Sequence, residues 1–381
     1  MTPLPCNNSD RQNGFSLLEL MVSITIGIIL MTGMVAMFNS SGEARRELEK
    51  TGTLIENGRF AINLLYDDVH HAGFFGQFYD LGDAPGVDPD PCFVPASVAD
   101  LAQLVTDLAM PLQGFRAATL AAQPGIVAAS TCDEQGVLPA TNFVAGSDIL
   151  VIRRADTAVF AGDPADPDFD DENAVFLQAN ARNLNLMFGA SGADVPATTA
   201  DNDLTASLPR YPSKGVGGTA DTRKFHVHVY FVAPCSYGSG ANETCTAADD
   251  DVPTLKRLEL DGVGGVTTMK IVSLVEGIEL MKVRYGLDTV PTAVNLTTGL
   301  VGDGMPDSYV AAPTLVQWPG VASVRIYLLA RSTQATQDYR DTKQYDLDGF
   351  TVAPSGDRFR RRVYSTEVMP INMAGRREIP N

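Results

Sequence analysis

The sequence lacks the signatures of the common catalytic and metal sites. It has four histidines and one tryptophan in 381 residues, and no two of its cysteines form a Cys-x-x-Cys pair. A Gly-x-Ser-x-Gly elbow, a phosphate-binding P-loop, a His-Glu-x-x-His pair and a Gly-x-Gly-x-x-Gly turn after a strand are all absent. We therefore expect neither an enzyme nor a protein that holds a cofactor or a resident metal ion.

Basic residues are also scarce. Lys and Arg number 28 against 46 Asp and Glu, which gives a formal net charge of −18. An acidic surface repels the phosphate backbone, so the charge excludes general nucleic-acid binding. Hydrophobic residues make up 45% of the chain, which is enough for a substantial core and excludes disorder along its whole length.

Five cysteines are present, and Cys6 stands apart from the other four at the amino terminus. An even number of cysteines in an exported region predicts two disulfides. The short interval between Cys235 and Cys245 reads as a closed loop, which leaves Cys92 and Cys132 as the second pair, one of three possible connectivities. The alternative is four buried free thiols in a cytosolic protein.

An apolar stretch lies close to the amino terminus. Residues 20–38 carry no charge, and with residues 15–18 the stretch reaches about 24 residues, or about 36 Å as a helix, which is enough to span a bilayer. Glu19 is its one charged residue, and a carboxylate left in lipid costs about 2 to 3 kcal/mol. A cleaved secretory signal is shorter than this stretch, and a plain membrane anchor leaves Glu19 unexplained.

The string GFSLLEL at residues 14–20 resembles the type IV prepilin signature. The resemblance implies that a prepilin peptidase cuts between Gly14 and Phe15 and N-methylates Phe15. Glu19 is then the fifth residue after the cut, and its carboxylate can neutralise the new terminal amine in a low dielectric. Basic residues follow the apolar stretch, so the orientation in the membrane comes from the resemblance and not from the charges.

The helical pattern continues past the apolar stretch and becomes amphipathic. Apolar residues recur every seven positions at Leu48, Ile55, Ile62 and Val69, and polar residues occupy the other face. One helix over residues 15–72 would be about 85 Å long, so we expect its first half to project from a globular head.

Strands dominate from residue 147. We expect them at residues 148–153, 224–233, 254–260, 269–285, 322–331 and 359–368, because these runs are β-branched or aromatic and are bounded by Gly, Pro or Asp. The predicted fold is α+β and pilin-like: a long spine helix packed on an antiparallel β-sheet head with long loops, one sheet face on the helix and one in water. Ser97 is expected to cap a short helix before the sheet.

Three clusters could carry chemistry. His226 and His228 share one strand face, but no third ligand is identifiable, so we place both on a solvated face; His70 and His71 are expected at the end of the spine helix. Residues 163–173, and residues 301–309 with Asp288, are oxygen-rich but lack a complete calcium-ligand series. We expect a run of four arginines to lie at the solvent-exposed end of a strand: Arg358, Arg360, Arg361 and Arg362.

Further phrases resemble the body of PilW-type minor pilins, at residues 67–76, 146–155, 275–288, 321–332 and 359–368. The resemblance implies five parts: a leader at 1–14, a transmembrane half of the spine at 15–38, an amphipathic half at 39–75, a loop-rich insertion at 76–145 and a sheet head at 146–381. It also implies a single-pass inner-membrane protein with a periplasmic head that later enters the pilus at the cell surface.

The implied function is that of a minor pilin at or near the tip of a type IV pilus, which primes assembly and supports motility or adhesion. The implied partners are the prepilin peptidase, other minor and major pilins, and a tip adhesin. Two alternatives remain: a minor pseudopilin of a type II secretion system, and a membrane-anchored periplasmic binding module. Cleavage between residues 14 and 15 with methylation of residue 15 is expected of a minor pilin or pseudopilin and not of an anchored binding module.

Overall fold

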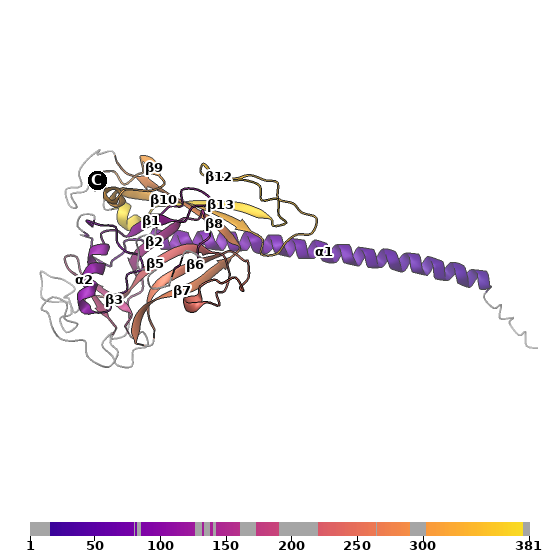
Figure 1. Ribbon diagram of the computed structural model, residues 1–381, viewed down its shortest axis with the longest axis horizontal. Helices are drawn as coiled ribbons and strands as arrows, with labels where there is room; N and C mark the ends of the chain where they lie inside the picture. Colours follow the sequence, from indigo (N-terminus) through magenta and orange to yellow (C-terminus); the bar gives the residue numbers. More distant parts are fainter. Residues whose placement is uncertain are drawn as a thin grey trace, which may run out of the picture. The chain divides into compact units, whose positions relative to one another are not determined.

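The computed structural model describes residues 16–79, 81, 85–125, 132, 138–139, 142–160, 173–189, 220–263, 265–289 and 302–375. The chain divides into two compact units, Met1–Gly52 and Thr53–Asn381. The boundary between the units falls inside the long helix α1, Leu17–His70 (Figure 1).

In the first unit, α1 is apolar over its opening turns. Leu17, Ile28 and Phe38 are each more than half exposed, as are most large apolar side chains between them. By length and composition this helix is able to cross a membrane.

The second unit is a β-rich head with short helices. Its helices are α2 (Val98–Asp107), η3 (Ala241–Glu243), η4 (Leu315–Gly320) and α4 (Ile371–Ala374). Its strands are β1 (Leu112–Phe115), β2 (Ile149–Ala155), β3 (Val175–Ala179), β4 (Leu184–Phe188), β5 (Thr222–Ala233), β6 (Thr254–Val263), β7 (Val266–Glu276), β8 (Ile278–Leu287), β9 (Ser308–Val310), β10 (Val321–Arg331), β11 (Tyr345–Leu347), β12 (Phe350–Val352) and β13 (Arg361–Val368).

The strands form two main antiparallel sheets. The seven-stranded sheet has the order β1-β2-β5-β3-β4, and β6 pairs with β5 and β7. The four-stranded sheet has the order β13-β10-β8-β9, and β11 and β12 form a separate hairpin. Short loops join β3 to β4 and β11 to β12, and a short loop favours antiparallel pairing.

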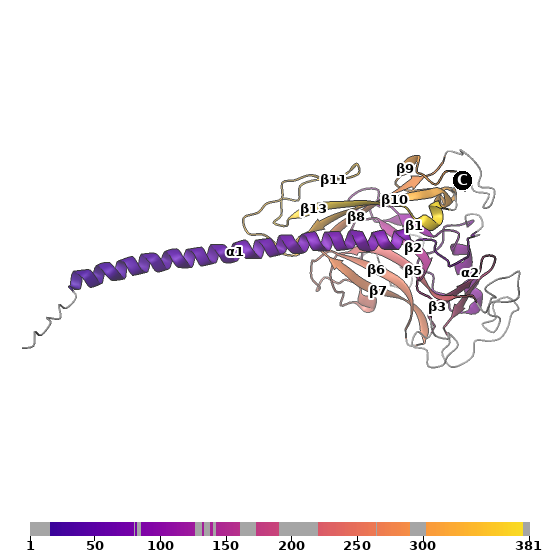
Figure 2. The same ribbon diagram turned by 180° about the vertical axis from the view of Figure 1, so that it is seen from behind.

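The second half of α1 packs between these two sheets (Figures 1 and 2). Its buried stripe contacts one face of each sheet; the stripe consists of Leu54, Ala61, Leu65 and Val69, with Ala72 just past the helix. On the sheets, side chains such as Ile152 of β2 and Ile326 of β10 complete this core. Of the four heptad positions predicted for the apolar face, Val69 is buried and Ile55 and Ile62 are half-buried, whereas Leu48 is 73% exposed.

The expectation of a sheet with one face in water is wrong for this head. The face of the seven-stranded sheet opposite α1 is covered by α2 and the segments around it, through Leu101, Leu104 and Phe75. The face of the four-stranded sheet opposite α1 is covered in part by the β11-β12 hairpin, through Tyr345 and Leu347. Both sheets therefore bury side chains on both faces.

The run at residues 269–285, expected as one strand, is two strands in different sheets. Gly277 separates β7 from β8 with a φ of +78°, and its carbonyl oxygen accepts a hydrogen bond from the backbone N–H of Arg331 at 2.7 Å. A Cβ at this position would lie 2.5 Å from the Arg331 carbonyl oxygen. Only glycine fits there, because L side chains disfavour a positive φ and the backbones approach closely.

The C-terminal end of the head returns to the end of α1. The Met369 carbonyl oxygen lies 3.2 Å from Nδ1 of His70, and the Asn372 side chain donates a hydrogen bond to the Ala72 carbonyl oxygen at 3.4 Å. Met373 is buried and packs beside Gly73. The last turn of α1 is thus covered by residues that lie about 300 positions later in the chain.

Gly58 provides a direct test of this packing. A Cβ at position 58 would lie 2.1 Å from Cε2 of Tyr364 on β13, whereas a Cβ at Gly52 has no heavy atom within 4 Å. We predict that Gly58→Ala lowers the stability of the full chain by about 1 to 3 kcal/mol, because overpacking outweighs the helix propensity gained from alanine. Gly52→Ala is the matched control and keeps or raises the unfolding temperature, measured by circular dichroism in detergent. Equal effects of the two substitutions would contradict the packing described here.

Candidate functional site

The amino-terminal site is built on the first turn of α1. Glu19 lies in that turn and is exposed, and the Ser23 hydroxyl donates a hydrogen bond to the Glu19 carbonyl oxygen at 2.7 Å. A carboxylate is favourable at a helix N-terminus, where the backbone N–H groups carry partial positive charge. Gly14 and Phe15, the residues on either side of the predicted cut, lie outside the described residues.

A second polar site lies at the other end of α1, inside the head. Asp68 is 5% exposed and accepts three hydrogen bonds from the seven-stranded sheet. Its donors are Nδ1 of His228 at 2.7 Å, the Tyr230 hydroxyl at 2.8 Å and Nε of Arg154 at 2.5 Å. Burial alone raises the pKa of Asp68, but the charges and hydrogen bonds of His228 and Arg154 outweigh it and hold this pKa well below its ordinary range.

The placement of His226 and His228 on a solvated face is therefore a wrong prediction. The two side chains do share one face of β5, opposite Phe225 and Val227, as the alternation requires. That face lies against α1 and not against water, so His228 is 3% exposed and its ring bonds Asp68. The alternation of side chains along the strand correctly placed both histidines on one face. It contains no information on α1, the helix that covers this face.

His226 lies at the margin of this site. Its Nε2 is 3.5 Å from the Asp156 carboxylate, and its ring centroid is 5.1 Å from that of His228. Burial, followed by the charges of His228 and Arg154, lowers the pKa of His226 to about 3, although Asp156 opposes the shift. His226 is therefore neutral over the physiological pH range.

Within the arginine run, Arg358 and Arg362 are exposed as expected, but Arg361 does not lie on a solvent-exposed strand end. Its side chain is 4% exposed and bonds three carboxylates: Glu279 at 2.5 Å, Asp341 at 3.0 Å and Asp357 at 2.6 Å. Burial lowers the pKa of this guanidinium, but the hydrogen bonds to Asp357 and Glu279 outweigh the effect, so the pKa is raised. The cluster joins β13 and β8 to the loops beside them inside one chain.

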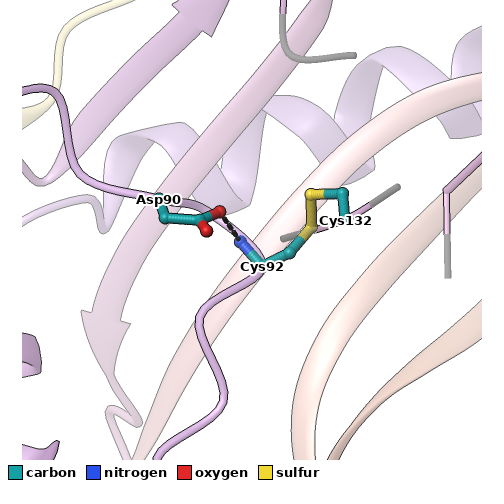
Figure 3. A group of neighbouring side chains, drawn as sticks. All are labelled: Asp90, Cys92 and Cys132. Carbon is teal, nitrogen blue, oxygen red and sulfur yellow. Dashed lines mark hydrogen bonds between the residues drawn. A yellow bond between two sulfur atoms is a disulfide. The ribbon is translucent and has the colours of Figure 1, made fainter. Parts of the chain in front are cut away.

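One group of three potential metal ligands occurs within the described residues. Ligand atoms of Asp90, Cys92 and Cys132 lie within 4.8 Å of one another (Figure 3). The two sulfur atoms are joined in a disulfide, and the Asp90 carboxylate accepts a hydrogen bond from the Cys92 N–H at 3.0 Å. A disulfide has no thiolate to offer a metal ion, so this group does not fit a metal centre. A second disulfide joins Cys235 to Cys245.

The acidic segments considered for calcium do not converge where they are described. Asp288, Asp303 and Asp307 each accept a hydrogen bond from a nearby backbone N–H, of Gly304, Met305 and Thr289 respectively. These three aspartates do not form a ligand group within 4.8 Å in the described part of the chain. Residues 163–172 of the other acidic run lie outside the described residues.

A small hollow of about 210 Å³ lies between the end of α1 and β3, lined by residues that include Phe74, Gln77 and Arg223. Arg223 donates to the carbonyl oxygens of Asp156 and Thr157 and lies over the Phe74 ring at 5.3 Å. The residues lining this hollow include one carboxylate, Asp221, which lies 3.7 Å from the Arg223 guanidinium, and no cysteine, serine or histidine.

The sequence pattern alone did not single out Asp68, the buried carboxylate that bonds α1 to the seven-stranded sheet. The available signal is its position on the buried stripe of α1, three residues after Leu65 and four before Ala72. A carboxylate inside an apolar helical stripe requires buried donors, because an unpaired buried charge is costly. The identity of those donors depends on strands that lie 86 to 162 residues away.

The low pKa of His226 gives the head a predictable response to acid. An unfolded histidine titrates near pH 6.5, whereas folded His226 titrates near pH 3. The unfolded state therefore binds the extra proton between these values, and stability falls as the pH falls from about 6.5 toward 3. We predict that His226→Gln flattens this slope in urea unfolding at pH 7.5, 5.5 and 4.5, relative to the wild type. An unchanged slope would contradict the buried, neutral state of His226.

Comparisons with known proteins agree with this architecture. Residues 229–372 match the family model of Type IV Pilus-assembly protein W, and residues 9–35 match the Prokaryotic N-terminal methylation motif. The searches of curated proteins and of solved structures found no significant match. The methylation motif and the apolar helix together suggest membrane anchoring and incorporation into a pilus, with interactions that pilins make in general. By these two matches, residues 229–372 are similar to PilW-type pilins and the N-terminal segment is similar to the prepilin methylation signature.

Proposed function

We propose that this protein is a minor pilin that enters the type IV pilus at or near its tip, where it primes assembly and supports motility or adhesion. The observation that carries the proposal is an apolar helix with one carboxylate, Glu19, in its first turn and the GF cleavage string before it. This combination suits a subunit that leaves the membrane, because a lone intramembrane carboxylate gains stability from a partner amine.

Processing creates that amine. The prepilin peptidase removes residues 1–14 and methylates the new terminal Phe15, which places a cation four residues before Glu19. Within the membrane the amine and the carboxylate neutralise each other. In the filament, Glu19 meets the terminal amine of a neighbouring pilin, and this pairing sets the axial position of the subunit.

The head supports a position near the tip through its size. The unit Thr53–Asn381 comprises most of the chain and carries sheets that bury side chains on both faces. A subunit at the end of a filament has neighbours on one side only, so a large head is easily accommodated there. The remaining surface is free to contact other minor pilins or a tip adhesin.

Processing is the first test. We expect intact mass and N-terminal analysis of the full chain to show loss of residues 1–14 and a methylated Phe15 when a prepilin peptidase is co-expressed, and neither change without it. Glu19→Val is expected to be cut but not assembled, because the terminal amine of a neighbour then lacks its counter-ion. Glu43→Val removes an exposed carboxylate farther along α1 and is the matched control. An uncut terminus would overturn the proposal in favour of an anchored binding module.

The second test separates a pilus from a secretion filament. In the source bacterium we expect loss of the gene to reduce surface pili, counted by electron microscopy, while type II secretion of exoenzymes is unchanged. The wild-type gene restores the pili and the Glu19→Val gene does not. Lost secretion with normal pili would instead identify a minor pseudopilin.

A further inference from the structure

The two disulfides of the head differ in the charged side chain that lies beside their sulfur atoms. Cys92 and Cys132 are 0% and 1% exposed, and a carboxylate oxygen of Asp90 lies within 4.8 Å of both sulfur atoms (Figure 3). A negative charge and an apolar environment both disfavour a thiolate. An external thiolate therefore has no open path to this disulfide, and the Asp90 carboxylate disfavours the negative charge that exchange would place on either sulfur.

The disulfide between Cys235 and Cys245 has a cation beside it. Nζ of Lys256 lies 3.8 Å from Sγ of Cys235, and both residues are buried, at 0% and 1% exposed. Cys245 at the other end of the bond is only partly buried. One sulfur thus faces an ammonium group inside the head, and the other belongs to a residue that is partly exposed.

Among the described residues, no carboxylate forms an ion pair with the Lys256 ammonium, which lies beside Sγ of Cys235. Burial lowers the pKa of Lys256, and the carboxylates of Glu243, Asp250 and Asp249 oppose this shift. Asp250 and Asp249 are themselves bonded to the backbone N–H groups of Ser236 and Thr246, at 2.8 and 2.7 Å. A neutral disulfide does not balance a buried ammonium, whereas a thiolate at Cys235 would form an ion pair with it.

We propose that Cys235–Cys245 is a thiol-exchange site that reacts with an external thiolate at the sulfur of Cys245. The incoming thiolate forms a bond to Sγ of Cys245, the Cys235–Cys245 bond breaks, and its electron pair leaves on Sγ of Cys235. The Cys235 thiolate pairs with the Lys256 ammonium, and Cys245 carries a mixed disulfide. A better-stabilised leaving thiolate departs faster, so Lys256 determines which sulfur leaves.

The reaction opens one loop and leaves the rest of the head closed. The loop between the two cysteines spans ten positions and carries Tyr237, which is 68% exposed. The attacking thiolate can come from a small thiol or from the reactive cysteine of a Cys-x-x-Cys oxidoreductase, because both offer the same group to Cys245. The proposal concerns the head alone and does not depend on the pilus function.

The test uses the oxidised full chain in detergent with reduced glutathione, quenched in acid with an alkylating agent and mapped by peptide mass spectrometry. We expect glutathione on Cys245, the alkyl group on Cys235, and an intact Cys92–Cys132 bond. Lys256→Met should slow the opening roughly tenfold, because the leaving thiolate loses its cation. Lys256→Arg should keep most of the rate, and Lys270→Met, which removes an exposed lysine on β7, should leave it unchanged.

Unfolding temperatures of the oxidised variants show whether each one is folded, so that a change in rate is read only from folded protein. A parallel reaction with an oxidoreductase whose second cysteine is Ser traps the mixed disulfide with a protein thiol. An adduct there but not with glutathione identifies a protein as the source of the thiolate. Adducts on Cys235, equal opening of both disulfides, or equal rates for Lys256→Met and Lys270→Met would each overturn the proposal.

Discussion

Burial of the second half of α1 between two sheets is the constraint on which the head depends. A helix enclosed on two sides must present small and apolar side chains to both sheets, which is why Ala61, Leu65 and Val69 are completely buried. The single carboxylate in this stripe, Asp68, then requires partners from the sheet it faces. Asp68 accepts hydrogen bonds from His228 and Tyr230 on β5 and from Arg154 on β2. These directional bonds define the position of the helix along the sheet more closely than non-directional apolar contacts do.

Local patterns were sufficient to predict α1, α2 and most long strands. The seven-residue recurrence on α1 and the alternation on β5 reflect periods that each element has on its own. What covers each face is set by distant segments, and local patterns do not contain that information. His228 and Arg361 were misplaced for this reason: the first is covered by α1, and the second is surrounded by carboxylates from β8 and two loops.

The short strands were not predicted for a related reason. Strands β9, β11 and β12 have three residues each, too few for alternation to be recognised, and β11 and β12 are recognisable only because they pair and cover the four-stranded sheet. The segment that matches the family model, residues 229–372, begins within β5 and contains β6, β7 and the whole four-stranded sheet. The region before it, including α2, supplies the cover of the face opposite α1.

The return of the C-terminal residues to α1 has a consequence for the order in which the head forms. The last turn of α1 emerges early in synthesis, whereas Met369 and the short helix α4, which cover it, emerge about 300 residues later. Contacts across such separations carry a high entropic cost and form slowly. The head therefore closes only after residues 369–374 have joined the folding chain, and until then this end of the buried stripe of α1 lacks part of its cover.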